Sequence, residues 1–244
     1  MTTPLVMIHG LLGPIDFFSP AELLDDIPVH TPDLLGYGRH GDATGPLTLA
    51  AQAAHVAQYI KTHVNEPCYV LGHSVGGAIA MLLARQEPRL VKGVISVEGN
   101  FTLNDAFWCR RIAPLDARAW TAEYTQMQSD PVAWLGKSCI ESDEERLAWA
   151  KAILTNQPHT TVQAMAQAVV KETSAPVFLE DIRALLDQKM PVWLLAGEKS
   201  AAGWDVPGWV RQAVRASVVL PDAGHMMMLE KPREFCGTLR SMLY

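Results

Sequence analysis

The sequence is poor in cysteine and has no run of basic residues. Its four cysteines are far apart and form no Cys-x-x-Cys pair, so neither a disulfide framework nor a zinc site is expected. We predict free thiols in a reducing compartment. The 20 Lys and Arg residues stand against 26 Asp and Glu residues, a formal net charge of −6. This balance argues against nucleic acid as a partner.

Long apolar runs are also absent. No stretch approaches the roughly 20 apolar residues that a membrane-spanning helix needs. The first residues, Met-Thr-Thr-Pro, lead directly into Leu5–Ile8 without the basic segment of a signal peptide. We therefore expect a soluble, cytoplasmic monomer or homodimer with no membrane partner.

The chain has 244 residues, and 49% of them are hydrophobic. This is enough for one large core or for one domain with an insertion.

Short apolar runs alternate with longer helical patterns, which is typical of a parallel α/β sheet. Several of the runs are almost wholly apolar, as strands covered on both faces should be. The expected strands are Leu5–His9, Pro28–Thr31, Cys68–Gly72, Val91–Val97, Val192–Ala196 and Ala216–Leu220. The expected helices between and after them are Ala50–Val64, Gly76–Gln86 and Lys231–Leu243.

The interval from Val97 to Val192 breaks this rhythm. It holds helical patterns but no convincing strand, and it contains four of the seven tryptophans. An insertion at the carboxyl end of a strand is placed to cover a site there, although such tryptophans also fill the core of an ordinary helical subdomain. We predict a core domain of residues 1–99 and 189–244 and a helical cap of residues 100–188. The helical patterns in the cap are Glu144–Leu154, Thr160–Lys171 and Val177–Gln188.

The most informative stretch is Gly72-His73-Ser74-Val75-Gly76. It lies between an apolar strand and a helical pattern, and a G-x-S-x-G in that context predicts a nucleophile elbow with the serine at its apex. Glycines at both ends let the strand and the helix approach closely. The helix begins at the serine, so its amino-terminal amides can stabilise an oxyanion.

Four motifs occur in an order that resembles the α/β-hydrolase superfamily over nearly the full chain. They are His9–Gly13 after the first strand, Pro32–Gly38 after the second, Gly72–Gly77 at the elbow and Pro221–His225 after the last strand. The first two strands usual in that family have no counterpart here. The resemblance therefore implies a mostly parallel sheet of about six strands, with the cap inserted after the fourth and Pro28–Thr31 at an edge.

The resemblance also implies the reacting groups of a serine hydrolase. Ser74 is expected as the nucleophile and His225 as its base, because an unassisted hydroxyl is a poor nucleophile at neutral pH. The backbone amides of Leu11 and Val75 are expected to form the oxyanion hole. His73 is expected to be structural. Neither a metal nor a cofactor is needed for this chemistry.

At the acid of the triad the sequence departs from the family pattern. Ser200 occupies the position where most relatives have an aspartate, and a serine cannot stabilise an imidazolium by charge. We favour Glu98, since a charged residue that closes an apolar strand needs a partner. Asp205 is the alternative acid, and Glu198 also stays open.

Trp108, Arg110 and Met226 are the candidates for substrate contact. The Arg110-Arg111 pair could clamp a substrate carboxylate, or it could be a solvated pair. The main hypothesis is a cofactor-independent hydrolase that cleaves a small-molecule ester or thioester through an acyl-enzyme on Ser74. The alternatives are a lyase or carbon–carbon hydrolase acting on an acidic substrate, and a non-enzymatic ligand-binding receptor.

Overall fold

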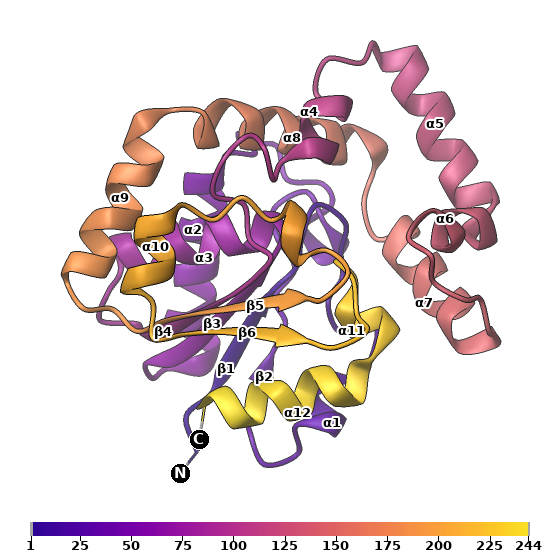
Figure 1. The fold of residues 1–244 in the computed structure, drawn as a ribbon. Coiled ribbons are helices and arrows are strands. Elements are labelled where there is room, and N and C mark those ends of the chain that lie inside the picture. The colour runs from indigo at the N-terminus through magenta and orange to yellow at the C-terminus, as the bar shows by residue number, and fades with distance from the viewer. Residues whose placement is uncertain (1, 244) are drawn as a thin grey trace.

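The computed structural model describes residues 2–243, and its centre is one six-stranded parallel sheet (Figure 1). The strand order is β2-β1-β3-β4-β5-β6. The strands are β1 (Leu5–Ile8), β2 (Val29–His30), β3 (Cys68–His73), β4 (Val91–Val97), β5 (Val192–Gly197) and β6 (Ala216–Leu220). The predicted sheet of about six parallel strands is confirmed, and the run around Pro28–Thr31 does supply an edge strand.

Alternation along the strands divides the core into two layers. Val6 and Ile8 of β1 face one apolar cluster, whereas Leu5 and Met7 face the other. Successive side chains of a strand point to opposite faces of a sheet, so a run of apolar residues buries both. This is why the inner strands read as continuous apolar segments.

Helices cover both faces of the sheet (Figure 1). On one face α2 packs against α3, and α9 against α3 and α10; on the other, α1 and α12 pack together. Their bounds are α1 (Pro20–Leu23), α2 (Leu49–Tyr59), α3 (Val75–Gln86), α9 (Pro176–Asp187), α10 (Gly208–Ala213), α11 (Met227–Glu230) and α12 (Pro232–Leu243). A π-helical turn, Ile60–Val64, extends α2. No helix within residues 2–243 has the length and apolarity to cross a membrane.

The interval between β4 and β5 is helical, as predicted. Besides α9 it contains α4 (Phe107–Ile112), α5 (Ala117–Ser129), α6 (Pro131–Lys137), α7 (Glu144–Thr155) and α8 (His159–Thr173). Helices α4, α5 and α6 were not predicted from the sequence. For α5 and α6 the signal was capping, because Asp116 and Asp130 accept hydrogen bonds from the first turns of these helices, whereas α4 has no side-chain cap.

The helices of this interval do not all lie in one place. In Figure 1, α5, α6 and α7 stand apart from the sheet, whereas α9 lies beside α3 and α10 and packs on them. The division of the chain into a core and a cap of residues 100–188 stays a prediction, and α9 belongs by its contacts to the helices that cover the sheet.

Candidate active site

Ser74 occupies a sharp turn between β3 and α3. Its φ of 54° and ψ of −122° lie outside the common regions for a residue with a side chain, which is a strain that proteins keep at functional sites. The flanking glycines are sterically required. A Cβ on Gly72 would lie 2.1 Å from the carbonyl oxygen of Gly76, and one on Gly76 would lie 2.5 Å from those of Ile8 and His9.

His225 lies in the loop between β6 and α11 and pairs with Glu98 at the end of β4. Its Nδ1 donates to Glu98 Oε2 over 2.7 Å. The other carboxylate oxygen, Oε1, accepts from the Gly197 amide at 2.8 Å and from the hydroxyl of Ser200. Burial alone would raise the pKa of Glu98, but the hydrogen bonds from His225, Ser200 and Gly197 outweigh it and hold this pKa below its ordinary value. Glu98 is therefore an ionised acceptor at neutral pH.

Two further histidines beside the elbow are buried and neutral. His73 Nε2 donates to the carbonyl oxygen of His225 over 2.9 Å, and the two rings lie 4.7 Å apart between centroids. Burial lowers the pKa of His73 to about 3. His9 donates from Nδ1 to Gly10 and accepts at Nε2 from the Leu34 amide, and burial lowers its pKa to about 4. The structural role expected for His73 agrees with these contacts.

The loop that carries Leu11 is held from two sides. The Tyr37 hydroxyl donates to the Leu11 carbonyl over 3.0 Å, and Gln157, which lies just after α7, accepts from the Gly13 amide over 3.0 Å. Within residues 2–243, neither the Leu11 nor the Val75 amide has a hydrogen-bond acceptor. Both amides therefore keep a hydrogen-bond donor that no other group uses, as an oxyanion hole requires.

A cavity of about 490 Å³ opens above the elbow. Ser74, His225, Leu11, Trp108 and Met226 all line it, so the structure brings the expected nucleophile and base to one space. Its volume falls within the range of small-molecule sites.

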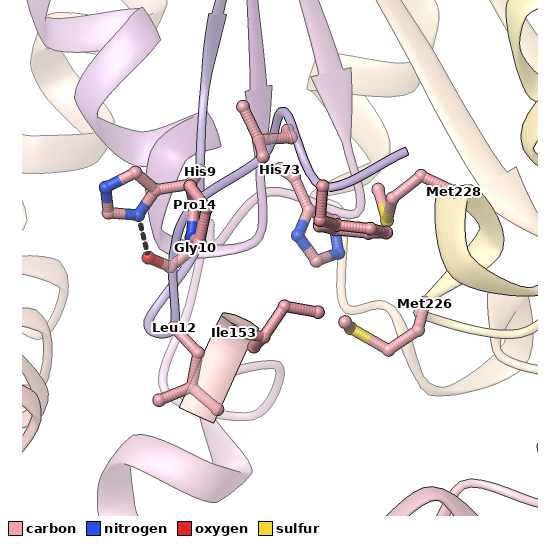
Figure 2. A pocket seen from close by; sticks show the side chains of 10 residues that line it. His9, Gly10, Leu12, Pro14, His73, Ile153, Met226 and Met228 are labelled. Atoms are coloured by element: carbon pink, nitrogen blue, oxygen red, sulfur yellow. Dashed lines mark hydrogen bonds between the residues drawn. The ribbon is translucent and has the colours of Figure 1, made fainter. Parts of the chain in front are cut away.

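A second, much smaller cavity lies behind the Gly10 loop. Figure 2 shows His73 and Met226 facing it, together with the hydrogen bond from His9 to the Gly10 carbonyl oxygen. Its volume of about 10 Å³ equals about one water molecule. The larger cavity is therefore the candidate substrate site.

One expectation about the cavity needs correction. Arg110 is exposed and does not line it, whereas Arg111 does. Consecutive residues of a helix point about 100° apart, and in α4 the side chain of Arg111 is the one of the pair that reaches the cavity. Both oxygens of Glu123 accept hydrogen bonds from the Arg111 guanidinium.

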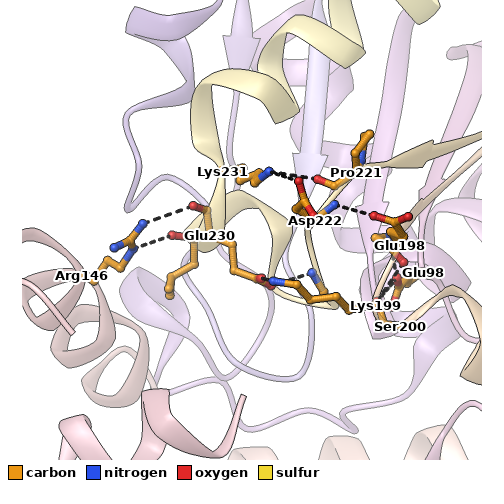
Figure 3. Close-up of polar contacts among 12 residues, drawn as sticks. Glu98, Arg146, Glu198, Lys199, Ser200, Pro221, Asp222, Glu230 and Lys231 are labelled. Carbon is orange, nitrogen blue, oxygen red and sulfur yellow. Dashed lines mark hydrogen bonds and ion pairs between the residues drawn. The ribbon is translucent and has the colours of Figure 1, made fainter. Parts of the chain in front are cut away.

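The alternative acids lie elsewhere. Asp205 accepts hydrogen bonds from the Thr102 hydroxyl at 2.7 Å and from Asn104 Nδ2 at 2.9 Å. Glu198 accepts from the Asp222 amide at 2.8 Å (Figure 3). Of the three carboxylates weighed from the sequence, Glu98 is the one that the structure brings into contact with His225.

Asp105 lines the cavity and was not predicted from the sequence. It accepts from the Phe101 amide at 2.9 Å and from Asn100 Nδ2 at 3.1 Å, and burial raises its pKa to about 6. A single aspartate in a loop has no motif that would have marked it. No cluster of three or more His, Cys, Asp or Glu side chains suited to a metal occurs in residues 2–243.

Comparison with known proteins gives matches over nearly the whole chain. The alpha/beta hydrolase family model matches residues 5–238. The chain is 26% identical to lipase LipV of Mycobacterium tuberculosis, over 91% of this chain and 86% of the lipase. It is 25% identical to the sn-1-specific diacylglycerol lipase ABHD11 of Danio rerio, over 99% of this chain and 78% of that protein.

Solved structures match the fold. A thermophilic esterase from Thermogutta terrifontis superposes with a TM-score of 0.76 and 21% identity, over 100% of this chain and 90% of the esterase. MenH from S. aureus superposes with a TM-score of 0.79 and 18% identity, over 100% of this chain and 94% of MenH.

Proposed function

Because this chain belongs to the alpha/beta hydrolase family, we propose that it is a cofactor-independent serine hydrolase that cleaves a carboxylic ester or thioester. One observation carries the proposal. A serine on a strained turn and a histidine paired with a buried carboxylate line the same cavity. The lipases and the esterase among the similar proteins support the same class of reaction.

The proposed mechanism uses the triad in two steps. The Ser74 hydroxyl attacks the acyl carbonyl while His225 takes its proton at Nε2, the nitrogen that Glu98 leaves free. The amides of Leu11 and Val75 stabilise the oxyanion. His225 then returns the proton to the leaving alcohol or thiol. In the second step it activates the water that cleaves the acyl-enzyme and frees Ser74.

Three cations line the cavity, and two of them are paired with carboxylates. Arg111 is already paired with Glu123, and Lys199 with Glu230 over 3.4 Å. A substrate carboxylate would have to break an existing ion pair to bind these cations. Lys137, the third cation, has no ion-pair partner among residues 2–243 and is open to a substrate carboxylate. The lyase or carbon–carbon hydrolase acting on an acidic substrate therefore stays the alternative.

The nucleophile is tested by labelling with a fluorophosphonate and by hydrolysis of p-nitrophenyl esters and matched thioesters, from acetyl to dodecanoyl. We expect labelling of the wild type at Ser74, none of Ser74→Ala, and turnover of several esters. Labelling without turnover of any ester or thioester would refute the proposed substrate class and favour the lyase, carbon–carbon hydrolase or receptor alternatives. No labelling of a folded protein would refute the proposed chemistry.

The acid is tested by Glu98→Gln, with Asp205→Asn as the matched control. Loss of the carboxylate beside His225 should lower kcat about 1,000-fold. Asp205 has its own partners at Thr102 and Asn104, so its substitution should leave kcat within a few-fold. A mild effect of Glu98→Gln together with a severe effect of Asp205→Asn would reverse the assignment.

A further inference from the structure

The turn that follows β5, Glu198–Ser200, connects the acid of the proposed triad to the histidine loop (Figure 3). The Lys199 amide donates to the Ala223 carbonyl over 2.9 Å. On the next residue, the Ser200 hydroxyl donates to Glu98 Oε1. The turn therefore touches both the loop that carries His225 and the carboxylate that His225 contacts.

Glu98 depends on this turn because it is only 5% exposed. Water cannot solvate the carboxylate there, so its charge has to be stabilised by hydrogen-bond donors from the protein. His225 donates a hydrogen bond to Oε2 of Glu98, and the Gly197 amide and the Ser200 hydroxyl donate to Oε1. Without the hydroxyl, Oε1 would keep a single neutral donor.

We propose that Ser200 is a positioning residue of the active site, whose hydroxyl keeps Glu98 ionised and holds its Oε2 toward His225. This inference rests on the proposed function. It gives a role to the residue that stands where an acid was expected from the family resemblance. The serine acts on the acid that the chain carries on the neighbouring strand, β4.

The contact predicts a change in pH dependence. The titratable groups that face Glu98 are His225 from the loop after β6 and His73 from β3, and His73 stays neutral. Removing the Ser200 hydroxyl makes the carboxylate more basic, so the Glu98–His225 pair binds a proton more tightly. The acid limb of kcat/KM should then move to higher pH.

The test is the pH profile of kcat/KM for Ser200→Ala on an ester that the wild type hydrolyses. We expect kcat to fall about tenfold, KM to change little, and the acid limb to rise by about one pH unit. Ser200→Thr keeps the hydroxyl and should restore the wild-type profile. Ser200→Cys, a weak donor of similar size, should give a smaller shift. Ser217→Ala, at an exposed serine of β6, is the control and should change nothing.

A double substitution separates this inference from the proposed function. In the Glu98→Gln background, Ser200→Ala should cost almost nothing more, since two residues that act through one contact are not additive. If Glu98→Gln is damaging but Ser200→Ala leaves the acid limb in place, or Ser200→Thr fails as badly as Ser200→Ala, the role of Ser200 is refuted and the triad stands. If Glu98→Gln is harmless, the triad itself falls.

Discussion

Acid should destabilise this protein through two buried histidines, His73 and His9. Burial lowers their pKa values to about 3 and about 4 from an ordinary value of 6.5. Below pH 6.5 the unfolded chain therefore binds protons at both residues, whereas the folded chain does not. Stability is thus fully present above this pH and is lost as the pH falls.

The size of the effect follows from the distance between the working pH and the ordinary pKa. At about pH 5, each histidine lies about 1.5 units below that value, which corresponds to about 2 kcal/mol of unfolding free energy. The two together cost about 4 kcal/mol relative to neutral pH. That is a large share of the roughly 5–15 kcal/mol that stabilises an ordinary domain.

His73→Gln tests this value, because glutamine can still donate to the His225 carbonyl but does not titrate. Urea unfolding followed by tryptophan fluorescence at about pH 7.5 and about pH 5 gives the pH-dependent loss for each protein. The loss should be about 2 kcal/mol smaller for His73→Gln than for the wild type. His63→Gln, at an exposed histidine, should keep the wild-type loss. An unchanged loss in His73→Gln would show that His73 is not held neutral by burial.

Three further substitutions and one control test the elbow, the Leu11 loop and the cavity. Gly72→Ala should prevent folding, because its Cβ would collide with the Gly76 carbonyl. Gly237→Ala in α12 is the control: its Cβ meets open space, and the substitution should raise the unfolding free energy by up to about 1 kcal/mol. The soluble yield and the urea unfolding curves of the two variants give the comparison. Gln157→Leu leaves the Gly13 amide without its acceptor and should cost about 2 kcal/mol in the same unfolding assay. The raised pKa of Asp105, about 6 instead of 3.8, means that its contribution to stability is present below about pH 4 and is lost as the pH rises through 6. Relative to Asp105→Asn, the wild type should therefore lose about 2 kcal/mol of unfolding free energy between about pH 4 and about pH 7.

The features that could be read from the sequence are those that depend on neighbouring residues. The strands follow from apolar runs bounded by turn residues, and the elbow follows from two glycines around Ser74. The steric requirement at Gly72 is local, since its Cβ would meet the Gly76 carbonyl, whereas Gly76 makes room for the carbonyls of Ile8 and His9. The family resemblance added the order of the motifs. The resemblance did not indicate which helices of residues 100–188 lie on the sheet, because the sequence of α9 has the same apolar pattern as any other amphipathic helix.

Contacts between distant parts of the chain were decided only by the tertiary structure. Three carboxylates were open as partners of His225, and the strand order and the loop after β6 bring Glu98 against it. Helix α4 presents Arg111, and not Arg110, to the cavity. The donor that Ser200 offers to Glu98 depends on the pairing of β4 with β5. Such contacts depend on how strands and loops are packed, and a pattern of neighbouring residues carries no record of that packing.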